Sequence, residues 1–512
     1  MFYMPVKGKA QFVCILLCLC VGCRTVKPIF QEEYIRPGLN QEWHEAFEKS
    51  RQSITKGMSE DRVPGLSIAL VDREGLIWSA GFGFTDYDCK VPVTPDTIFS
   101  IQSMSKTFTA TAVMMAVQDR LVDLDAPISE YLPDFKIKSR FEENPEQKIT
   151  LRHLLSHTAG FVHEAPVGNN LEHESPSFEA HIKSISDTWL KFPVGARESY
   201  SNLGIDLAAY IIELRSGRSF ADYTKEKIFD PLDMLNSSMD MGFIRQHINR
   251  AIGHRPPHMK GTRLEIPMLA AGGVYTSAND LSRFIQFHLN HGLVDGKVII
   301  NKEVLENMFT PPLLGICAGT YTGNPNNPSG IDGSFSWNHG GGGFGFNSIM
   351  GWLPDYEMGV LVLVNSVKHN NLHGKSAFVI ANEVVLNGLV KKKDSKINLR
   401  YEAIQTYNMK YSEYQTPDPD SFTPYKQEWK KYTGTYKHLD DQNLYIYARV
   451  ALALGYPELK SKVYKKNGFL EIDGMRLDEY QPGVFFTANG DCLDFSGPIP
   501  LWKGLRIKKK LL

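Results

Sequence analysis

The 512-residue sequence predicts an α/β (α+β) protein with one antiparallel sheet flanked by helices, an all-helical subdomain, and a small C-terminal β domain. Three observations predict this fold class. Strand-like runs lie at both ends of residues 39–390, a mostly helical stretch separates them, and short β-rich runs follow a polar segment. Because each apolar sheet face must be covered, strands on both sides of a helical insertion predict one sheet beside a helical subdomain.

The first elements in order are a helix and a hairpin. Residues 39–56 place apolar side chains on one side at helical spacing, which predicts an amphipathic helix. Two apolar runs at 66–71 and 76–80 enclose the polar turn 72–75 and predict a β-hairpin.

The later elements complete the same sheet. A mostly helical stretch extends from about residue 103 to 287, and strand character returns at 347–353 and 359–364. A last apolar helix is expected over 376–389. Together these segments predict a main domain over residues 39–390.

The flanking segments have other compositions. Residues 24–38 are expected to be a short linker, and residues 391–424 have the polar, proline-containing composition of a second linker. Residues 425–512 contain several short β-rich runs, which predict a separate β domain of barrel or sandwich type.

The N-terminal residues 1–23 predict export. Lys7 and Lys9 precede an apolar run from 12 to 22, the pattern of a secretory signal peptide. The run ends in L-C-V-G-C, which resembles a bacterial lipobox, although Cys20 stands where such motifs usually have leucine. The expectation is a protein of the bacterial cell envelope, periplasmic and tethered to the membrane through lipidated Cys23. The alternative is simple cleavage near this point and release.

Composition excludes several classes of function. Lys+Arg number 56 against 57 Asp+Glu, a formal net charge of −1, which argues against nucleic-acid binding. No apolar run reaches the ~18–20 residues that a membrane-spanning helix needs, so a polytopic membrane protein is excluded. Beyond residue 23, Cys89, Cys317 and Cys492 are scattered, which fits neither a disulfide framework nor a metal cluster.

The first catalytic candidate is the sequence S-M-S-K at residues 103–106. Residues three apart share a helix face, so the Ser103 hydroxyl and the Lys106 amine can meet. Residues 107–118 carry no charge, which predicts a buried helix. Burial disfavours the charged form of a lysine, and a neutral amine can take the proton of a serine hydroxyl. A second copy, S-I-T-K at residues 53–56, ends a polar helix and is expected to be solvated.

Two further motifs follow. In Y-S-N at 200–202, a tyrosine hydroxyl can relay a proton and an asparagine amide can orient a substrate carbonyl. In H-G-G-G-G at 339–343, glycines entering a strand let a substrate backbone approach closely and leave an N–H free as an oxyanion donor. This run also fits G-x-G-x-x-G, but a strand rather than a helix follows it, so a dinucleotide site is rejected.

In this order the three motifs resemble those of the serine β-lactamase and penicillin-binding-protein superfamily, specifically its class C-like branch. The resemblance covers roughly residues 40–390 and includes L-R-H-L-L-S-H-T-A-G at 151–160. It implies a β-lactamase/transpeptidase-like fold with the site between an α/β sheet domain and a helical domain. It also implies a serine hydrolase that forms an acyl-enzyme and releases it with water, without a cofactor.

The resemblance assigns roles to individual residues. Ser103 is the implied nucleophile, Lys106 its general base and Tyr200 the proton shuttle. Asn202 is expected to bind the substrate, and the N–H groups of Ser103 and Gly342 are expected to form the oxyanion hole.

The third motif is also expected to bind substrate, through His339, Gly340 and Gly341. Family members that bind a substrate carboxylate have lysine where this chain has His339. A histidine, with a reference pKa of about 6.5, is mostly neutral at pH 7. The sequence therefore favours a peptidase or an esterase over a β-lactamase, without excluding the last.

Alternatives stay open at this stage. His153 and His157 have the spacing of metal ligands, but the glutamate of H-E-x-x-H is missing and no metal is expected. A catalytically silent binding or regulatory protein of the cell envelope is the rival to the enzyme. The expected partner is a small-molecule or peptide substrate, and the sequence leaves the oligomeric state open.

Overall fold

The computed structural model of the chain describes residues 30–88, 90–170, 176–255, 259–260, 268–309, 337–367, 389–391, 415–438 and 460–509. The predicted signal segment with Cys23 lies outside the described residues. So does the helix expected over 376–389, apart from its last residue.

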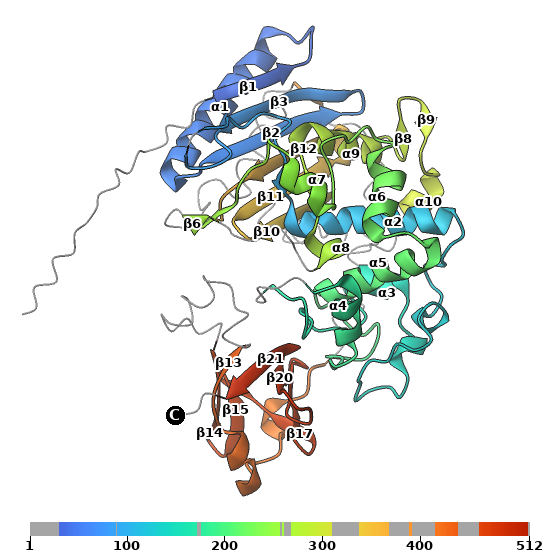
Figure 1. Cartoon of the computed structure of the whole chain (residues 1–512), viewed down its shortest axis with the longest axis vertical. Helices are drawn as coiled ribbons and strands as arrows, with labels where there is room; N and C mark the ends of the chain where they lie inside the picture. The colour runs from blue at the N-terminus through green and yellow to red at the C-terminus, as the bar shows by residue number, and fades with distance from the viewer. Residues whose placement is uncertain are drawn as a thin grey trace, which may run out of the picture.

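A six-stranded antiparallel sheet forms the centre of the main domain (Figure 1). Its order is β1-β3-β2-β12-β11-β10, so the first three strands of this sheet lie side by side and join the last three through the pairing of β2 with β12. This arrangement confirms the predicted fold class. The strands span Phe30–Ile35 (β1), Gly65–Asp72 (β2), Gly75–Gly83 (β3), Trp337–Gly343 (β10), Phe346–Leu353 (β11) and Met358–Val364 (β12).

Strand β1 corrects the expected linker at 24–38. Residues 30–35 pair with β3 at the edge of the sheet, so the linker assignment is wrong for them. The polar sequence F-Q-E-E-Y-I conceals the strand because an edge strand needs little apolar surface. Glu33 instead accepts a hydrogen bond from Trp78 Nε1 at 2.9 Å and pairs with Arg51 at 2.6 Å.

The described helices of the main domain cover the sheet and form the helical subdomain; the first lies between β1 and β2, and the others lie between β3 and β10. The longer ones are capped by their own sequence: Asn40 accepts the N–H of Trp43 before α1, and Gly217 ends α5 with positive φ. The helices are Gln41–Asp61 (α1), Ser105–Gln118 (α2), Leu151–Leu155 (α3), Phe178–Ile185 (α4), Asn202–Ser216 (α5), Phe220–Thr224 (α6), Met241–Gln246 (α7), Leu269–Gly272 (α8), Ala278–Leu289 (α9) and Lys302–Glu306 (α10).

Alternation along β2 divides the core into two layers. Ile68 and Leu70 are fully buried in the cluster that contains the apolar side of α1, whereas Ala69 and Val71 join the cluster that contains α9. Period-two alternation sends successive side chains to opposite faces. The sheet is therefore covered on both faces, and the larger core continues into the helical subdomain.

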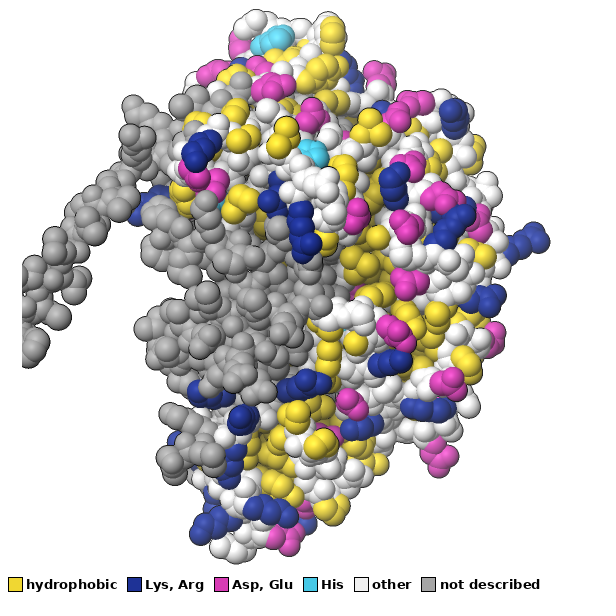
Figure 2. All heavy atoms as spheres, in the orientation of Figure 1, with side chains coloured by type: hydrophobic (Ala, Val, Ile, Leu, Met, Phe, Trp, Pro, Cys, Tyr) yellow, Lys and Arg dark blue, Asp and Glu magenta, His cyan; other side chains and the backbone are white. Residues whose placement is uncertain are grey.

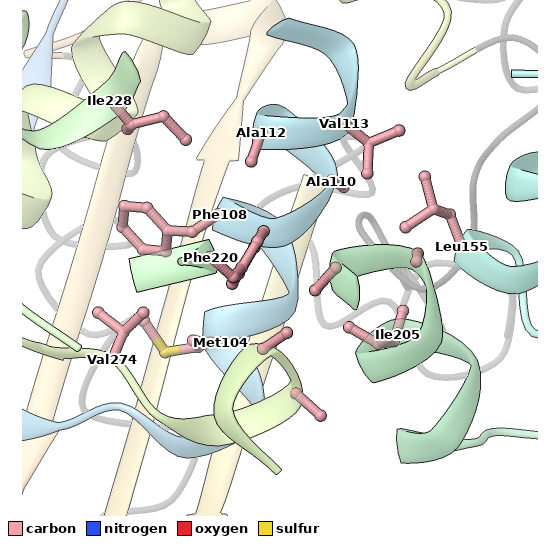
Figure 3. Packing of buried hydrophobic residues seen from close by; sticks show 14 of the residues in the cluster. Met104, Phe108, Ala110, Ala112, Val113, Leu155, Ile205, Phe220, Ile228 and Val274 are labelled. Atoms are coloured by element: carbon pink, nitrogen blue, oxygen red, sulfur yellow. The ribbon is translucent and has the colours of Figure 1, made fainter. Parts of the chain in front are cut away.

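Helix α2 lies in the middle of the larger core. Its residues from Ser105 to Ala116 are all buried, which confirms the expectation drawn from its uncharged sequence. Figure 3 shows labelled apolar side chains on both sides of this helix, with Phe108 facing one group of neighbours and Leu155 and Ile205 beyond the other side. A helix surrounded in this way is a rigid support for the residues at its start.

The C-terminal β domain is a single nine-stranded antiparallel sheet with the order β16-β15-β14-β13-β21-β20-β19-β18-β17. Trp429, Leu470, Phe485 and Trp502 are buried in its core. Its strands are Gly434–His438 (β13), Lys460–Lys466 (β14), Phe469–Ile472 (β15), Met475–Arg476 (β16), Asp478–Gln481 (β17), Val484–Phe486 (β18), Cys492–Asp494 (β19), Leu501–Trp502 (β20) and Leu505–Lys509 (β21).

The surface agrees with the balanced charge of the chain. Figure 2 shows basic and acidic side chains interspersed over the visible face, without a large area of one sign. Within the described ranges, no helix combines the length and the apolar character needed to cross a membrane.

Candidate active site

The first motif lies at the start of α2. Residues Gln102–Met104 form one 3₁₀ turn and α2 continues from Ser105, so Ser103 and Lys106 share one side of a continuous helical run. Lys106 Nζ lies 3.2 Å from Ser103 Oγ. Ser103 is partly exposed, whereas Lys106 is fully buried. A hydroxyl open to substrate thus adjoins a buried amine.

A backbone carbonyl holds Lys106. Its Nζ lies 2.8 Å from Ala271 O at the end of α8. Among the residues that the structure describes, no acidic side chain forms an ion pair with Lys106. A buried amine without a carboxylate partner is the environment that a lysine general base requires.

Asp206 fixes the segment that holds Lys106. This fully buried residue of α5 accepts the N–H groups of Ala270 and Ala271 on Oδ1, each at 3.0 Å. Its Oδ2 lies 3.3 Å from His181 Nε2. Asp206 is not among the residues predicted from the motifs, although a single charged residue within the apolar run 203–212 is a usable signal. A buried His–Asp pair therefore positions the carbonyl that binds Lys106 Nζ.

This pair predicts a pH dependence of stability. Burial alone lowers the pKa of His181, but its hydrogen bond to Asp206 and the charge of that carboxylate outweigh burial and raise the pKa. The contribution of His181 is therefore fully present below the unfolded pKa of about 6.5 and is lost as pH rises through the raised folded value. We expect the difference in unfolding temperature between the native protein and His181→Gln to shrink as pH increases from about 6 to about 9. Thermal scans across that range, with exposed His44→Gln as the control, measure it; a difference that grows with pH contradicts the prediction.

The second motif lies beside the first. The ring of Tyr200 is half-buried and its centroid is 4.8 Å from Lys106 Nζ. Two histidines flank this ring, His157 at 4.5 Å and His163 at 5.5 Å between centroids. The ring of Tyr200 therefore lies beside Lys106 Nζ, and its role as a proton shuttle stays a prediction.

His157 lies at this site, although the sequence indicated only its metal-ligand spacing from His153. Its Nδ1 accepts the N–H of Ser201 at 3.3 Å, which leaves the ring hydrogen on Nε2. Burial, followed by the nearby charge of Lys106, lowers the pKa of His157 well below 6.5, so it is neutral at pH 7. The other histidine of this segment, His153, instead belongs to the N-terminal cap of α3. Its Nδ1 lies 3.1 Å from Thr150 Oγ1.

Asn202 is the first residue of α5 and is buried, with 5% of its surface exposed. Its Nδ2 donates to Glu164 Oε1 at 3.0 Å. Because a carboxylate can only accept, this bond also fixes which end of the Asn202 amide is nitrogen. The expected hydrogen bond from Asn202 to a substrate stays a prediction.

The third motif brings strand β10 against Ser103. A Cβ atom built on Gly341 would lie 2.0 Å from Ile101 O and 3.0 Å from Ser103 N, so only glycine permits this approach. Gly342 is the next residue, and its N–H stays the predicted second oxyanion donor. His339 is buried and its Nδ1 lies 2.7 Å from Gly340 O.

Replacement of Gly341 tests this approach. In Gly341→Ala the new methyl group meets backbone atoms that cannot move without shifting β10 away from Ser103. We expect hydrolysis to fall by about 10²–10³-fold, the worth of an oxyanion donor. Gly340→Ala, whose methyl would meet nothing closer than 3.7 Å, should lose much less. Equal losses in kcat/KM for the two variants would contradict a specific contact at Gly341.

The residue before Ser103 has a strained backbone. Gln102 has φ 51°, a left-handed value that is unfavourable for a residue with a side chain, and it is buried. Its Nε2 donates to Ser100 Oγ at 2.7 Å. Strain of this kind is concentrated at functional sites, where the surroundings impose it. Nothing in the sequence indicated it, because glutamine has no preference for this conformation.

Other features of the described structure lie apart from this site. A cavity of about 590 Å³, lined by Asp123, Asp125, Arg152 and Arg215 among others, contains no residue of the motifs at 103–106, 200–202 and 339–343. Over the described ranges, no group of three or more His, Cys, Asp or Glu side chains is arranged to hold a metal ion.

Known proteins resemble about three fifths of this chain. Beta-lactamase-like protein 2 of Dictyostelium discoideum is 26% identical over 325 residues, which cover 61% of this chain and 57% of that protein. Protein flp of Staphylococcus aureus (strain MRSA252) is 24% identical over 325 residues, 61% of each chain. The chain thus spans less than two thirds of the length of either relative.

Solved structures share the fold. The octameric penicillin-binding protein homologue from Pyrococcus abyssi has a TM-score of 0.55 at 21% identity, covering 89% of this chain and 95% of that one. A beta-lactamase from Sulfitobacter sp. EE-36 has a TM-score of 0.54 at 21% identity, covering 67% and 99%. The family model described as Beta-lactamase matches residues 51–384. Since that match spans most of the sequence and includes all three motifs, the chain belongs to the beta-lactamase family.

Proposed function

We propose that the protein is a serine hydrolase that cleaves an amide or ester bond through an acyl-enzyme on Ser103. One observation carries the proposal: Lys106 Nζ, fully buried, lies 3.2 Å from the Ser103 hydroxyl and is held by Ala271 O. This pairing supplies a nucleophile and its base, which a binding protein of the same fold does not need.

The proposed reaction has two halves. Lys106 Nζ acts as the base and takes the Ser103 proton while Oγ attacks the carbonyl carbon and the carbonyl oxygen becomes an oxyanion. The N–H groups of Ser103 and Gly342 bind this oxyanion. The intermediate collapses, the leaving group departs with a proton relayed through Tyr200, and the acyl group stays on Oγ. Water then attacks the ester carbonyl, the bond to Oγ breaks, the acyl group leaves as a carboxylic acid, and Ser103 Oγ takes back a proton.

The third motif supports a substrate without an obligatory carboxylate. Where carboxylate-binding relatives have lysine, this chain has His339, buried and bonded through Nδ1 to Gly340 O. No flexible ammonium is available at this position to attract a carboxylate. We therefore favour peptidase or esterase activity, and β-lactamase activity is the lesser candidate.

A substrate panel tests the proposal. The full chain is assayed against a chromogenic cephalosporin, a p-nitrophenyl ester and D-amino-acid peptides, each with the Ser103→Ala variant beside it. Turnover of an ester or peptide that is lost in the variant supports the proposal and ranks the substrate classes. Turnover retained in Ser103→Ala excludes the mechanism, and inactivity together with no covalent adduct on Ser103 favours the silent binding protein.

We propose also that the chain is exported and tethered through Cys23. Support comes from the basic residues, the short apolar run and the terminal L-C-V-G-C of residues 1–23. In a bacterial host, the mature N-terminal mass should show cleavage before Cys23 and added acyl chains. Cys23→Ser should release the protein from the membrane fraction; a protein that remains soluble with Cys23 intact contradicts the tether.

A further inference from the structure

We propose that the C-terminal β domain is a positioning element of the active site, acting through the tight turn between β20 and β21. The proposal rests on the serine hydrolase function above and adds to it a part of the chain outside the three motifs. Figure 1 shows β20 and β21 at the end of the C-terminal domain nearest the helical subdomain.

The turn is a two-residue hairpin connection. Trp502 pairs with Leu505, so Lys503 and Gly504 form the turn, with φ 53° and 84°. Two consecutive positive φ values are typical of a type I′ turn, which favours glycine at its second position. The turn therefore has a fixed shape.

Gly504 brings the turn into close contact with the main domain. A Cβ atom built on it would lie 2.3 Å from Glu164 O and 2.8 Å from Val162 Cγ2. The backbone of the C-terminal domain thus reaches the segment Val162–Glu164 at a distance that excludes any side chain at residue 504.

The segment Val162–Glu164 contacts all three residues of the second motif. The ring of His163 stacks on Tyr200, and Ser201 Oγ donates to Val162 O at 2.6 Å. Asn202 donates its backbone N–H to His163 O at 3.1 Å and its Nδ2 to Glu164 Oε1 at 3.0 Å. A shift of this segment therefore moves the proton shuttle and the substrate-binding amide together.

The Glu164 carboxylate organises this contact. Its Oε1 lies within hydrogen-bonding distance of three nitrogens, Asn202 Nδ2 at 3.0 Å, Asn170 Nδ2 at 2.8 Å and His163 Nδ1 at 2.9 Å. The residue is 8% exposed. Charge-assisted hydrogen bonds inside a protein are stronger than neutral ones, so Glu164 fixes the orientation of Asn202.

Further contacts hold the C-terminal domain in this place. Asp494 accepts a hydrogen bond from Trp189 Nε1 at 2.9 Å and pairs with Lys138 at 3.3 Å. Lys191 pairs with Asp491 at 3.0 Å, and Trp189 packs in a buried cluster that includes Phe486. The turn at Gly504 is thus the tip of a docked domain whose position is set by buried contacts.

Gly504→Ala tests the proposal against a matched variant, Gly468→Ala. Gly468 occupies the same second position in the two-residue turn between β14 and β15, with φ 83°, and a Cβ there meets nothing within 4 Å. Both variants therefore carry the same backbone strain in the same domain, but only the methyl group of Gly504→Ala meets the segment Val162–Glu164.

The readout is the rate of Ser103 acylation by a fluorophosphonate probe, followed by intact mass on the full chain, together with kcat and KM on an active substrate. We expect Gly504→Ala to acylate about 10²-fold more slowly, with the loss in kcat, because small displacements of catalytic groups cost that much. Gly468→Ala should stay near the native rate, with a similar change in unfolding temperature. Equal acylation rates in the two variants overturn the proposal.

Two further measurements keep the test decisive. If Gly504→Ala does not fold, Asp494→Asn is the second variant, because it weakens the contact between the two domains without enlarging the side chain. An unchanged acylation rate in that variant overturns the proposal. In the double variant with Glu164→Ala, the two losses should be less than additive, since both act through Asn202. If the native chain does not label at Ser103, both the proposed function and this proposal are wrong. If the native chain labels and Gly504→Ala and Gly468→Ala acylate at equal rates, only this proposal is wrong.

Discussion

Replacing Ser103 by alanine should abolish turnover and covalent labelling while leaving the fold intact. Ser103 is the partly exposed hydroxyl that Lys106 Nζ approaches to 3.2 Å, and no acyl-enzyme can form without its Oγ. A nucleophile that acts as a unit with its base is worth on the order of 10⁶ in kcat. The loss should appear in kcat, with an unfolding temperature close to that of the native protein. Steady-state kinetics and fluorophosphonate labelling measure both effects.

The chain provides a matched control for this variant. Ser53 begins the second S-x-x-K sequence and is exposed on α1, with Lys56 exposed three residues later. Ser53→Ala should retain native activity and labelling. A Ser103→Ala protein that still turns over substrate would place the nucleophile elsewhere.

Lys106→Met should give the second largest loss. Methionine fills a similar volume in the buried position but cannot accept the Ser103 proton, and positioned proton transfer contributes about 10²–10⁴-fold to a rate. Because Lys106 is fully buried without a carboxylate partner among the described residues, we expect stability to be kept or raised. Acylation kinetics and thermal unfolding of the same preparation separate the two effects.

The exposed Lys56→Met again serves as the control, with no expected change in acylation. A slow but complete acylation of Lys106→Met that becomes faster at high pH supports the role of a base, since hydroxide replaces the missing amine. An acylation rate equal to that of the native protein would assign the base to another group.

The sequence was most informative where the chemistry depends on neighbours along the chain. The three-residue spacing of Ser103 and Lys106 predicts their approach, because helical geometry brings such residues together. The uncharged run after them predicts the burial of α2, and strands on both sides of the helical stretch predict the mixed sheet. In each case the signal lies within one element or in the order of elements.

What the sequence did not indicate depends on contacts across long separations. Asp206 and Ala271 are 65 residues apart along the chain, yet their hydrogen bond positions Lys106. Glu164 meets the turn at Gly504 only because the C-terminal domain docks where it does. The edge strand at residues 30–35 was missed for a different reason, since its stability comes from pairing with β3 and not from its own apolar residues.

The pairing of β2 with β12 determines when this protein can fold. Leu66 lies opposite Val364, and Gly65 N donates to Asn365 Oδ1 across 300 residues of chain. Contacts of such high sequence separation form slowly, because a long loop must close before they stabilise anything. A ribosome must therefore complete nearly the whole catalytic segment before β2 finds its second neighbour. Until then the strand has an unpaired edge and uncovered apolar faces, so a nascent chain depends on prompt completion or on a chaperone to avoid aggregation.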